Sequence, residues 1–173
     1  MEIKTVLSIV AGLGSALICS ANTSPLEVGA PAPVVKTVDE EGKEITIVDP
    51  SAKGFVLVYF YPKADTPGCT AQACSLRDAY TNITDEGITV YGVSTDTPDD
   101  QKAFKEKYDL PFTLIADSDG KVVEAFGVPL RGSFAKRQAF LIKDGKIVWR
   151  DLSASTAKQA DDVLTIVKEK SGA

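Results

Sequence analysis

The sequence predicts a mixed α/β fold in which helices cover a partly parallel central sheet. A continuous apolar run of seven residues, from Phe55 to Tyr61, lacks alternation and suits a strand that is covered on both faces. Segments with strand patterns then alternate with segments with helical patterns. Because the chain finishes with a hairpin pattern and a helix, we expect antiparallel strands in the same sheet.

The first half of the domain contains a hairpin, a buried strand and a helix. Residues 22–33 are rich in Pro, Gly, Ser and Ala and predict an extended lead-in. The segments 34–38 and 44–48 flank a glycine-containing turn and predict a hairpin. Pro62 ends the buried strand, and a helical pattern follows over 67–83. The candidates for the inward face of this helix are Ala71, Cys74, Leu76 and Tyr80.

The second half repeats strands and helices and closes with a hairpin and a helix. Thr97 and Pro98 end a segment that is typical of a capped helix start. The dipeptide Asp144–Gly145 is typical of a tight hairpin turn. The expected elements are a buried strand at 88–93, a helix at 99–108, a strand at 112–115, a turn at 117–120 with a short helix through 126, a hairpin of 138–142 and 146–149, and a closing helix at 156–170.

Composition excludes several classes of function. The chain has 173 residues, 44% of them hydrophobic, which is enough for one domain with a real core. The net charge is −5, so the chain lacks the broad positive surface that binding to nucleic acid or anionic lipid requires. There is no histidine, which excludes Ser-His-Asp triads, Cys-His dyads, imidazole zinc ligands and histidine acid–base chemistry.

The N-terminal segment resembles a targeting sequence. Residues 6–18 form an uncharged run of 13 residues, whereas a stable membrane span takes about 20. Lys4 and the amino terminus supply a positive end, and the small residues before Asn22 predict cleavage after Ala21. We therefore expect a signal peptide at 1–21, a single mature domain at 22–173, export to the periplasm and no stable membrane span.

Two other interpretations of this segment stay open. Cys19 could carry a lipid anchor, although the bulky Ile18 precedes it where lipoproteins have a small residue. Alternatively, the segment could remain uncleaved as a partly buried first helix. Cleavage after Ala21 would leave two cysteines in the mature chain, Cys69 and Cys74.

Cys69 lies where chemistry is expected in an α/β fold, just after a buried strand and at the start of a helix. The positive end of a helix favours a thiolate there. Pro67 suits the first helical position because its missing N–H would be unpaired in any case. Gly68 allows a ligand to approach the backbone, and Thr66 can place a hydroxyl beside the sulfur.

The spacing of the two cysteines makes a disulfide incompatible with an intact helix. Along a helix, five residues correspond to a Cα separation of roughly 8–9 Å, beyond the ~7 Å that a disulfide permits. A bond between Cys69 and Cys74 therefore requires local unwinding. The residues alone also allow an inert buried pair, a static disulfide or, less favourably, half of a zinc site.

The string from Phe60 to Cys74, FYPKADTPGCTAQAC, resembles the peroxiredoxins, in the branch known as bacterioferritin comigratory protein or peroxiredoxin Q. It contains the pattern Pro62-x-x-x-Thr66-x-x-Cys69. The likeness extends from about Val28 to the C-terminus. Further matching strings are Tyr91-Gly-Val-Ser-Thr-Asp, Phe104-x-x-Lys-Tyr-x-Leu-Pro-Phe112 and Arg137-x-x-Phe140-Leu-Ile.

This resemblance implies a thioredoxin-like fold with peroxiredoxin additions and a thiol-dependent peroxidase. By the same resemblance, Cys69 is the peroxidatic cysteine, and Cys74 is the resolving cysteine that forms a disulfide with it. The implied supporting residues are Pro62, Thr66 and Arg137, with Thr66, Gly68 and Arg137 binding the substrate. The implied substrates are hydrogen peroxide or organic hydroperoxides, the reductant is a thioredoxin-like dithiol, and the enzyme is a monomer without a metal or other cofactor.

Thiol acidity alone does not explain fast peroxide reduction. For a cysteine in general, a pKa lowered from ~8.5 to ~6 raises the thiolate fraction about 30-fold at pH 7. The accompanying loss of nucleophilicity removes roughly 10- to 18-fold of that gain. Most of the rate must therefore come from fixed hydrogen-bond donors that stabilise the negative charge on the peroxide oxygens. The candidates are Arg137, Thr66 and the backbone N–H groups near Gly68.

Two other functional classes share parts of this pattern. An exported thiol–disulfide oxidoreductase has the same fold and compartment, but normally carries Cys-x-x-Cys instead of the Cys-x4-Cys found here. A binding module with a structural disulfide would react only slowly with peroxide.

Overall fold

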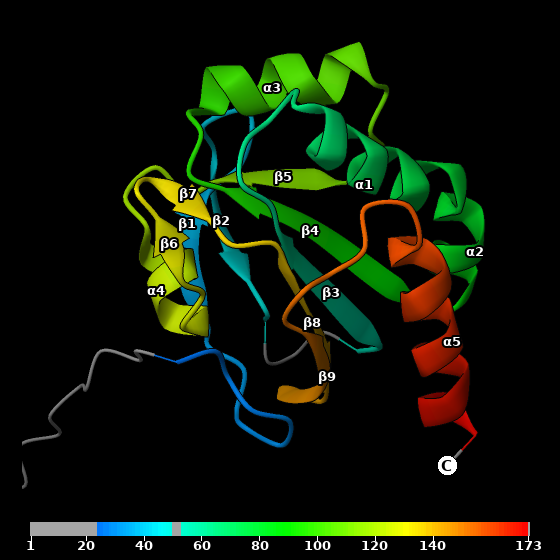
Figure 1. Cartoon of the computed structure of the whole chain (residues 1–173). Helices are drawn as coiled ribbons and strands as arrows, with labels where there is room; N and C mark the ends of the chain where they lie inside the picture. Colours follow the sequence, from blue (N-terminus) through cyan, green and yellow to red (C-terminus); the bar gives the residue numbers. More distant parts are fainter. Residues whose placement is uncertain (1–23, 50–52, 173) are drawn as a thin grey trace, which may run out of the picture.

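The computed structural model describes residues 24–49 and 53–172, so the expected signal peptide at 1–21 and Cys19 lie outside the described residues. The centre of the fold is a five-stranded sheet with the order β5-β4-β3-β8-β9 (Figure 1). Strand β3 is parallel to β4 and antiparallel to β8, which confirms the mixed sheet. The strands are β3 (Phe55–Phe60), β4 (Ile88–Ser94), β5 (Thr113–Ala116), β8 (Gln138–Lys143) and β9 (Lys146–Asp151).

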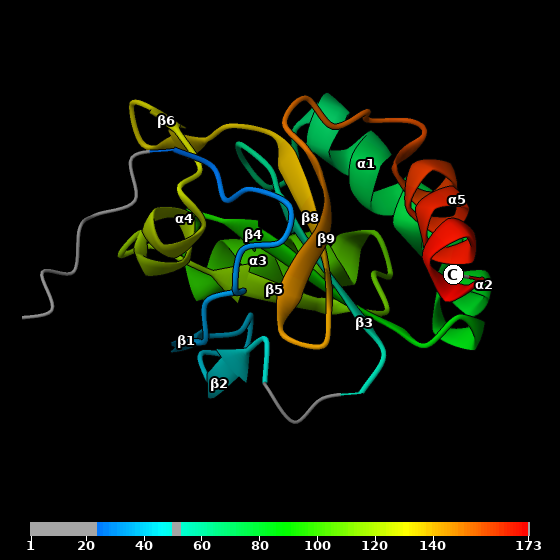
Figure 2. The ribbon, with the colours of Figure 1, turned by 90° about the horizontal axis from the view of Figure 1, so that it is seen from below.

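Helices cover one face of this sheet, and a short helix with a separate hairpin covers the other. Figures 1 and 2 show α1, α2 and α5 together on one side, with α4 and the β1–β2 hairpin opposite. Helix α3 packs beside β5. The bounds are α1 (Pro67–Asp78), α2 (Tyr80–Asp85), α3 (Pro98–Lys107), α4 (Lys121–Phe126), α5 (Gln159–Ser171), β1 (Val35–Val38) and β2 (Glu44–Ile47). Among the described residues, no helix has the length and apolar character that a membrane span requires.

Strand β3 contributes to two hydrophobic cores because its side chains alternate between the faces of the sheet. Leu57 and Tyr59 face the core under α1, α2 and α5, whereas Val56 and Val58 face the core under α4. All six residues of β3 are buried, as the uninterrupted apolar run predicts for a central strand.

The predicted helix over 67–83 is wrong in its continuity and in part of its inward face. The chain breaks at Ala79 into α1 and α2. The buried residues of α1 are Cys69, Gln72, Ala73 and Leu76, at the i, i+3, i+4, i+7 spacing of one helical face. Ala71 is exposed, Cys74 and Tyr80 are half-buried, and the polar Gln72 takes the inward place instead.

Two further elements differ from the expectation. The closing helix α5 begins at Gln159, three residues later than predicted. A small hairpin of β6 (Leu130–Arg131) and β7 (Phe134–Ala135) was not predicted, because strands of two residues are too short to show alternation. The other hairpins and helix starts agree with the expected ranges within one or two residues.

Candidate active site

The first turn of α1 places Cys69 at the carboxyl end of the central strand. Pro62 follows β3, Thr66 is the extended residue that precedes the helix, and Pro67 is its first residue. Cys69 is the third helical residue and is only 2% exposed. The thiol is therefore buried at the positive end of a 12-residue helix.

The Thr66 hydroxyl bonds to the loop and does not cap the helix. Its Oγ1 donates to the carbonyl oxygen of Lys63 at 3.0 Å, and its side chain makes no cap hydrogen bond. A helix start normally uses such a side chain to satisfy a free N–H group of the first turn. Here the Thr66 side chain does not bond these N–H groups, and its oxygen can still accept a hydrogen bond.

Arg137 reaches the sulfur from the strand that neighbours β3. Because β8 is antiparallel to β3 with Gln138 opposite Phe60, the residue before β8 lies at the carboxyl end of β3. The Arg137 Nη2 donates to Cys69 Sγ at 3.3 Å. A Cβ atom at Gly68 would lie 3.3 Å from the same Nη2, so Gly68 leaves room for the guanidinium.

Gln72 is a member of the site that the sequence analysis did not identify. Its Oε1 accepts a hydrogen bond from Arg137 Nη1, so the two outer nitrogens of one guanidinium bond Cys69 and Gln72. The Gln72 Nε2 donates to Gln159 Oε1 of α5 at 2.8 Å. Gln72 lies three residues after Cys69, and this spacing on a helix was the available signal.

Two buried tyrosines lie on the sheet face that α1 covers. The rings of Tyr59 and Tyr61 stack with centroids 5.6 Å apart, and Tyr59 shares a hydrophobic core with Cys69. Burial raises the pKa of Tyr59 well above its usual range, and burial likewise raises the pKa of Tyr61. Both phenols therefore stay neutral under the thiol, and Tyr61 donates to Gln101.

Cys74 lies on the same helix, with its side chain half-buried. Both thiols are free, and α1 is continuous from Pro67 to Asp78. The helix thus holds the two cysteines at the separation of roughly 8–9 Å that its geometry dictates. The structure shows the reduced arrangement, and it does not show the Cys69–Cys74 disulfide.

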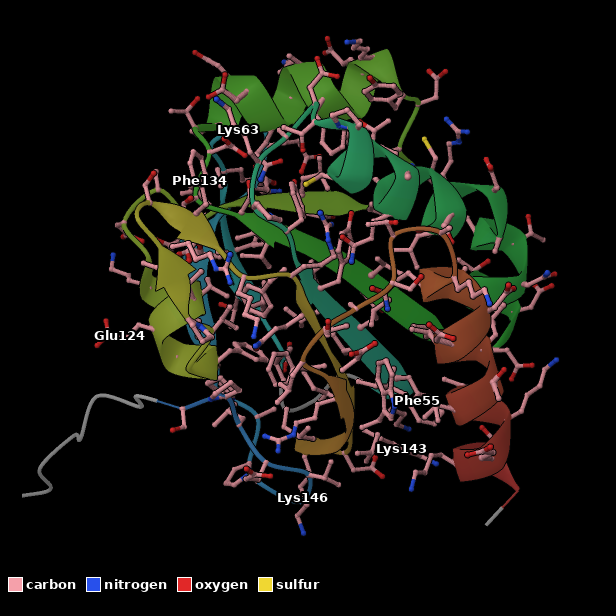
Figure 3. All side chains as sticks on the ribbon, viewed as in Figure 1. Phe55, Lys63, Glu124, Phe134, Lys143 and Lys146 are labelled. Carbon is pink, nitrogen blue, oxygen red and sulfur yellow. The ribbon has the colours of Figure 1, made fainter. Side chains whose placement is uncertain are left out.

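A pocket of about 340 Å³ opens beside Pro62 and Arg137. Its other lining residues come from the β6–β7 hairpin and the segment that leads to β8. Phe134 is 44% exposed in this hairpin, and Figure 3 places its side chain on the same side of the molecule as Lys63, at the start of the loop before α1. The full lining is Pro62, Arg131, Phe134, Ala135, Lys136 and Arg137.

The chain matches a known family over most of its length. Residues 28–150 match the model of the AhpC/TSA family. The chain belongs to this family. Peroxiredoxin Bcp of Escherichia coli strain K12 is 42% identical over 154 residues, which cover 84% of this chain and 98% of that protein. A chloroplastic peroxiredoxin Q of Gentiana triflora is 40% identical over 122 residues, which cover 69% of this chain and 56% of that protein.

Solved structures agree with this assignment. The peroxidoxin BcpB from Mycobacterium tuberculosis superposes with a TM-score of 0.77 at 30% identity, covering 83% of this chain and 97% of that chain. A bacterioferritin comigratory protein from Xanthomonas campestris has a TM-score of 0.74 at 25% identity, covering 85% and 98%. The protein is therefore a peroxiredoxin of the Bcp and peroxiredoxin Q type, with a thioredoxin-like fold and thiol-dependent peroxidase activity. The alternative of a thiol–disulfide oxidoreductase is not favoured.

No group of three or more Cys, Asp or Glu side chains within the described ranges could hold a metal ion.

Proposed function

We propose that Cys69 is the peroxidatic cysteine of this enzyme and attacks the nearer oxygen of a hydroperoxide. The observation that carries this assignment is the burial of its sulfur in the first turn of α1, with Arg137 Nη2 at 3.3 Å. As the S–O bond forms, the O–O bond breaks and the departing oxygen takes a proton. Cys69 becomes a sulfenic acid, and water or an alcohol leaves.

Arg137 and the first turn of α1 would supply most of the rate. The guanidinium can donate to the peroxide oxygen on which negative charge develops, because it already lies beside the attacking sulfur. With its proton directed to Lys63, Thr66 Oγ1 can accept from the hydroxyl of the peroxide. Gly68 leaves the approach open, and Pro62 shapes the wall of the site.

We further propose that Cys74 resolves the sulfenic acid. Its thiol condenses with Cys69–SOH, which gives the Cys69–Cys74 disulfide and one water. Because α1 holds the Cα atoms too far apart, the segment between them must first unwind. An external thioredoxin-like dithiol then restores both thiols by exchange. Resolution within one chain needs no second subunit, which is consistent with a monomer.

Both hydrogen peroxide and organic hydroperoxides are proposed as substrates. Pro62, Phe134 and Arg137 line the same pocket, and its volume of about 340 Å³ can hold an organic substituent. The Xanthomonas relative with the same fold is described by its alkyl peroxide reduction activity. Phe134 and Pro62 offer an apolar surface for such a group.

Export of the enzyme is proposed from the sequence alone. The apolar run at 6–18 and the small residues at 19–21 form the pattern of a signal peptide, and the family match begins only at residue 28. Mass spectrometry of the enzyme from a periplasmic fraction tests this proposal. A mature chain that begins at Asn22 is expected, whereas an intact Met1 or a lipid on Cys19 would contradict it.

The assignment of Cys69 is tested by single-turnover oxidation. The variant Cys69→Ser is expected to lose hydrogen peroxide consumption, because serine offers no comparable nucleophile. The matched control Cys74→Ser keeps the proposed nucleophile and is expected to take up one oxygen atom at residue 69, detected by intact-mass spectrometry. Retained peroxide consumption by Cys69→Ser would refute the assignment.

A further inference from the structure

A chain of buried and half-buried hydrogen bonds joins Cys69 to α5. Arg137 Nη1 donates to Gln72 Oε1, and Gln72 Nε2 donates to Gln159 Oε1 at 2.8 Å. The side chains of Gln72 and Gln159 are both fully buried. Cys69 is thereby linked, through three hydrogen bonds, to Gln159, the first residue of α5.

Arg137 fixes the orientation of the Gln72 amide, and Gln159 supplies the acceptor that this orientation requires. A guanidinium can only donate, so the Gln72 oxygen must face Arg137 and its NH₂ group must face α5. That NH₂ group needs an acceptor, which the Gln159 oxygen supplies. Gln159 Nε2 has no hydrogen-bond partner among the described residues, so Gln159 acts here as an acceptor alone.

The same residues hold the segment that must unwind for resolution. Gln72 lies between Cys69 and Cys74, and Ser75 Oγ accepts a hydrogen bond from the backbone N–H of Ala160 at 3.3 Å. The first turn of α5 therefore contacts α1 on both sides of Cys74. Unwinding this part of α1 must separate Gln72 from Gln159.

We propose that Gln159 is a positioning residue for the peroxidase reaction: through Gln72 it holds Arg137 against Cys69, and it delays the unwinding that brings Cys74 to Cys69. This inference rests on the proposed roles of Cys69 and Cys74. It predicts that loss of the Gln159 acceptor changes two steps in opposite directions. Peroxide reduction slows because Arg137 is less well held, and disulfide formation accelerates because the intact helix loses a contact.

The test uses Gln159→Met, which keeps the length of the side chain and removes its acceptor. In a Cys74→Ser background, rapid-quench mass spectrometry measures the second-order oxidation of Cys69 by hydrogen peroxide. With both cysteines present, it measures the first-order formation of the disulfide. One buried hydrogen bond corresponds to about a two- to tenfold change, which we expect as a fall in the first rate constant and a rise in the second.

Two variants complete the design. Gln159→Glu retains an acceptor oxygen for Gln72 and is expected to restore the oxidation rate toward that of the wild type. Gln138→Met removes another buried glutamine of this region, one outside the hydrogen-bond chain, and controls for the general cost of such a change. If Gln159→Met does not fold, Gln159→Leu takes its place.

Opposite changes in the two rate constants, with rescue by Gln159→Glu, would support the proposal. Unchanged rate constants, or a parallel fall in both like that of the Gln138→Met control, would overturn it. If Cys69 of the Cys74→Ser protein is not oxidised at all, the proposed function itself fails and this inference falls with it. These results are distinguishable because the last one appears without any change at Gln159.

Discussion

Removal of the Arg137 guanidinium should slow the oxidation of Cys69 by one to two orders of magnitude. The group donates to Sγ at 3.3 Å, and its second nitrogen is held by Gln72. A hydrogen bond that involves a charged group contributes about 1.5–3 kcal/mol. If that contribution is made fully in the transition state, Arg137→Met should lower the second-order rate constant about 10- to 150-fold. Arg137→Lys should restore little, because an ammonium cannot bond Cys69 and Gln72 in the same planar arrangement.

The assay measures the oxidation of the Cys74→Ser protein by hydrogen peroxide in a rapid-quench experiment, and intact-mass spectrometry detects the added oxygen. Lys146→Met is the matched control, since it removes the same charge from an exposed residue of β9 that lies outside the pocket lining. We expect this control to stay within about twofold of the wild type, because exposed charges are strongly screened. An equal fall in the oxidation rate constant of the two variants would show that the overall electrostatic field of the protein, and not the Arg137 contact, determines the rate.

Three further changes test other parts of the structure. Cys74→Ser should consume one equivalent of peroxide and then stop cycling with thioredoxin; sustained steady-state turnover would contradict a resolving role. Gly68→Ala should slow Cys69 oxidation a few-fold while the melting temperature holds or rises, because a Cβ would lie 3.3 Å from Arg137 Nη2 but alanine favours the helix. Asp117 is buried, and burial raises its pKa to about 6. Its folded form therefore binds a proton more readily than the unfolded chain, and stability should fall by at most about 3 kcal/mol as the pH rises from 4 to 6. Urea unfolding should show that the stability of the wild type relative to Asp117→Asn falls over that range, and a constant difference between the two proteins would refute the assignment.

The architecture could be predicted where a pattern was long and one-sided. The seven-residue run from Phe55 became the central strand because only a strand covered on both faces buries every residue. The break at Ala79 was missed since neither proline nor glycine marks it, and the helical pattern continues to the buried Ile83. The β6–β7 hairpin depends on tertiary packing, because two residues a strand carry no periodic signal.

The site was predicted in its local part and missed in its long-range part. Cys69 at the helix start and Arg137 at the sulfur follow from short motifs, and the structure brings these two together. Gln72 was overlooked because a polar residue within a helix is expected to face water, although its spacing from Cys69 placed it on the same face. No sequence pattern could identify Gln159, because its role depends on how α5 packs against α1.

The two proposed chemical steps need opposite properties from the start of α1, and its weak cap serves both. Helix α3 begins with a Thr97 side-chain cap and two acidic residues in its first turn, whereas α1 has neither. A missing cap costs a helix about 1 kcal/mol, which lowers the barrier to unwinding between Cys69 and Cys74. Neither the Thr66 hydroxyl nor an acidic side chain of the first turn then occupies the N–H groups at the start of α1. The order that peroxide reduction requires must then come from tertiary contacts, and the bonds from α1 to Arg137 and to α5 are of this kind. Tertiary contacts therefore position Cys69 while α1 is intact, and the uncapped N-terminus still allows the helix to unwind.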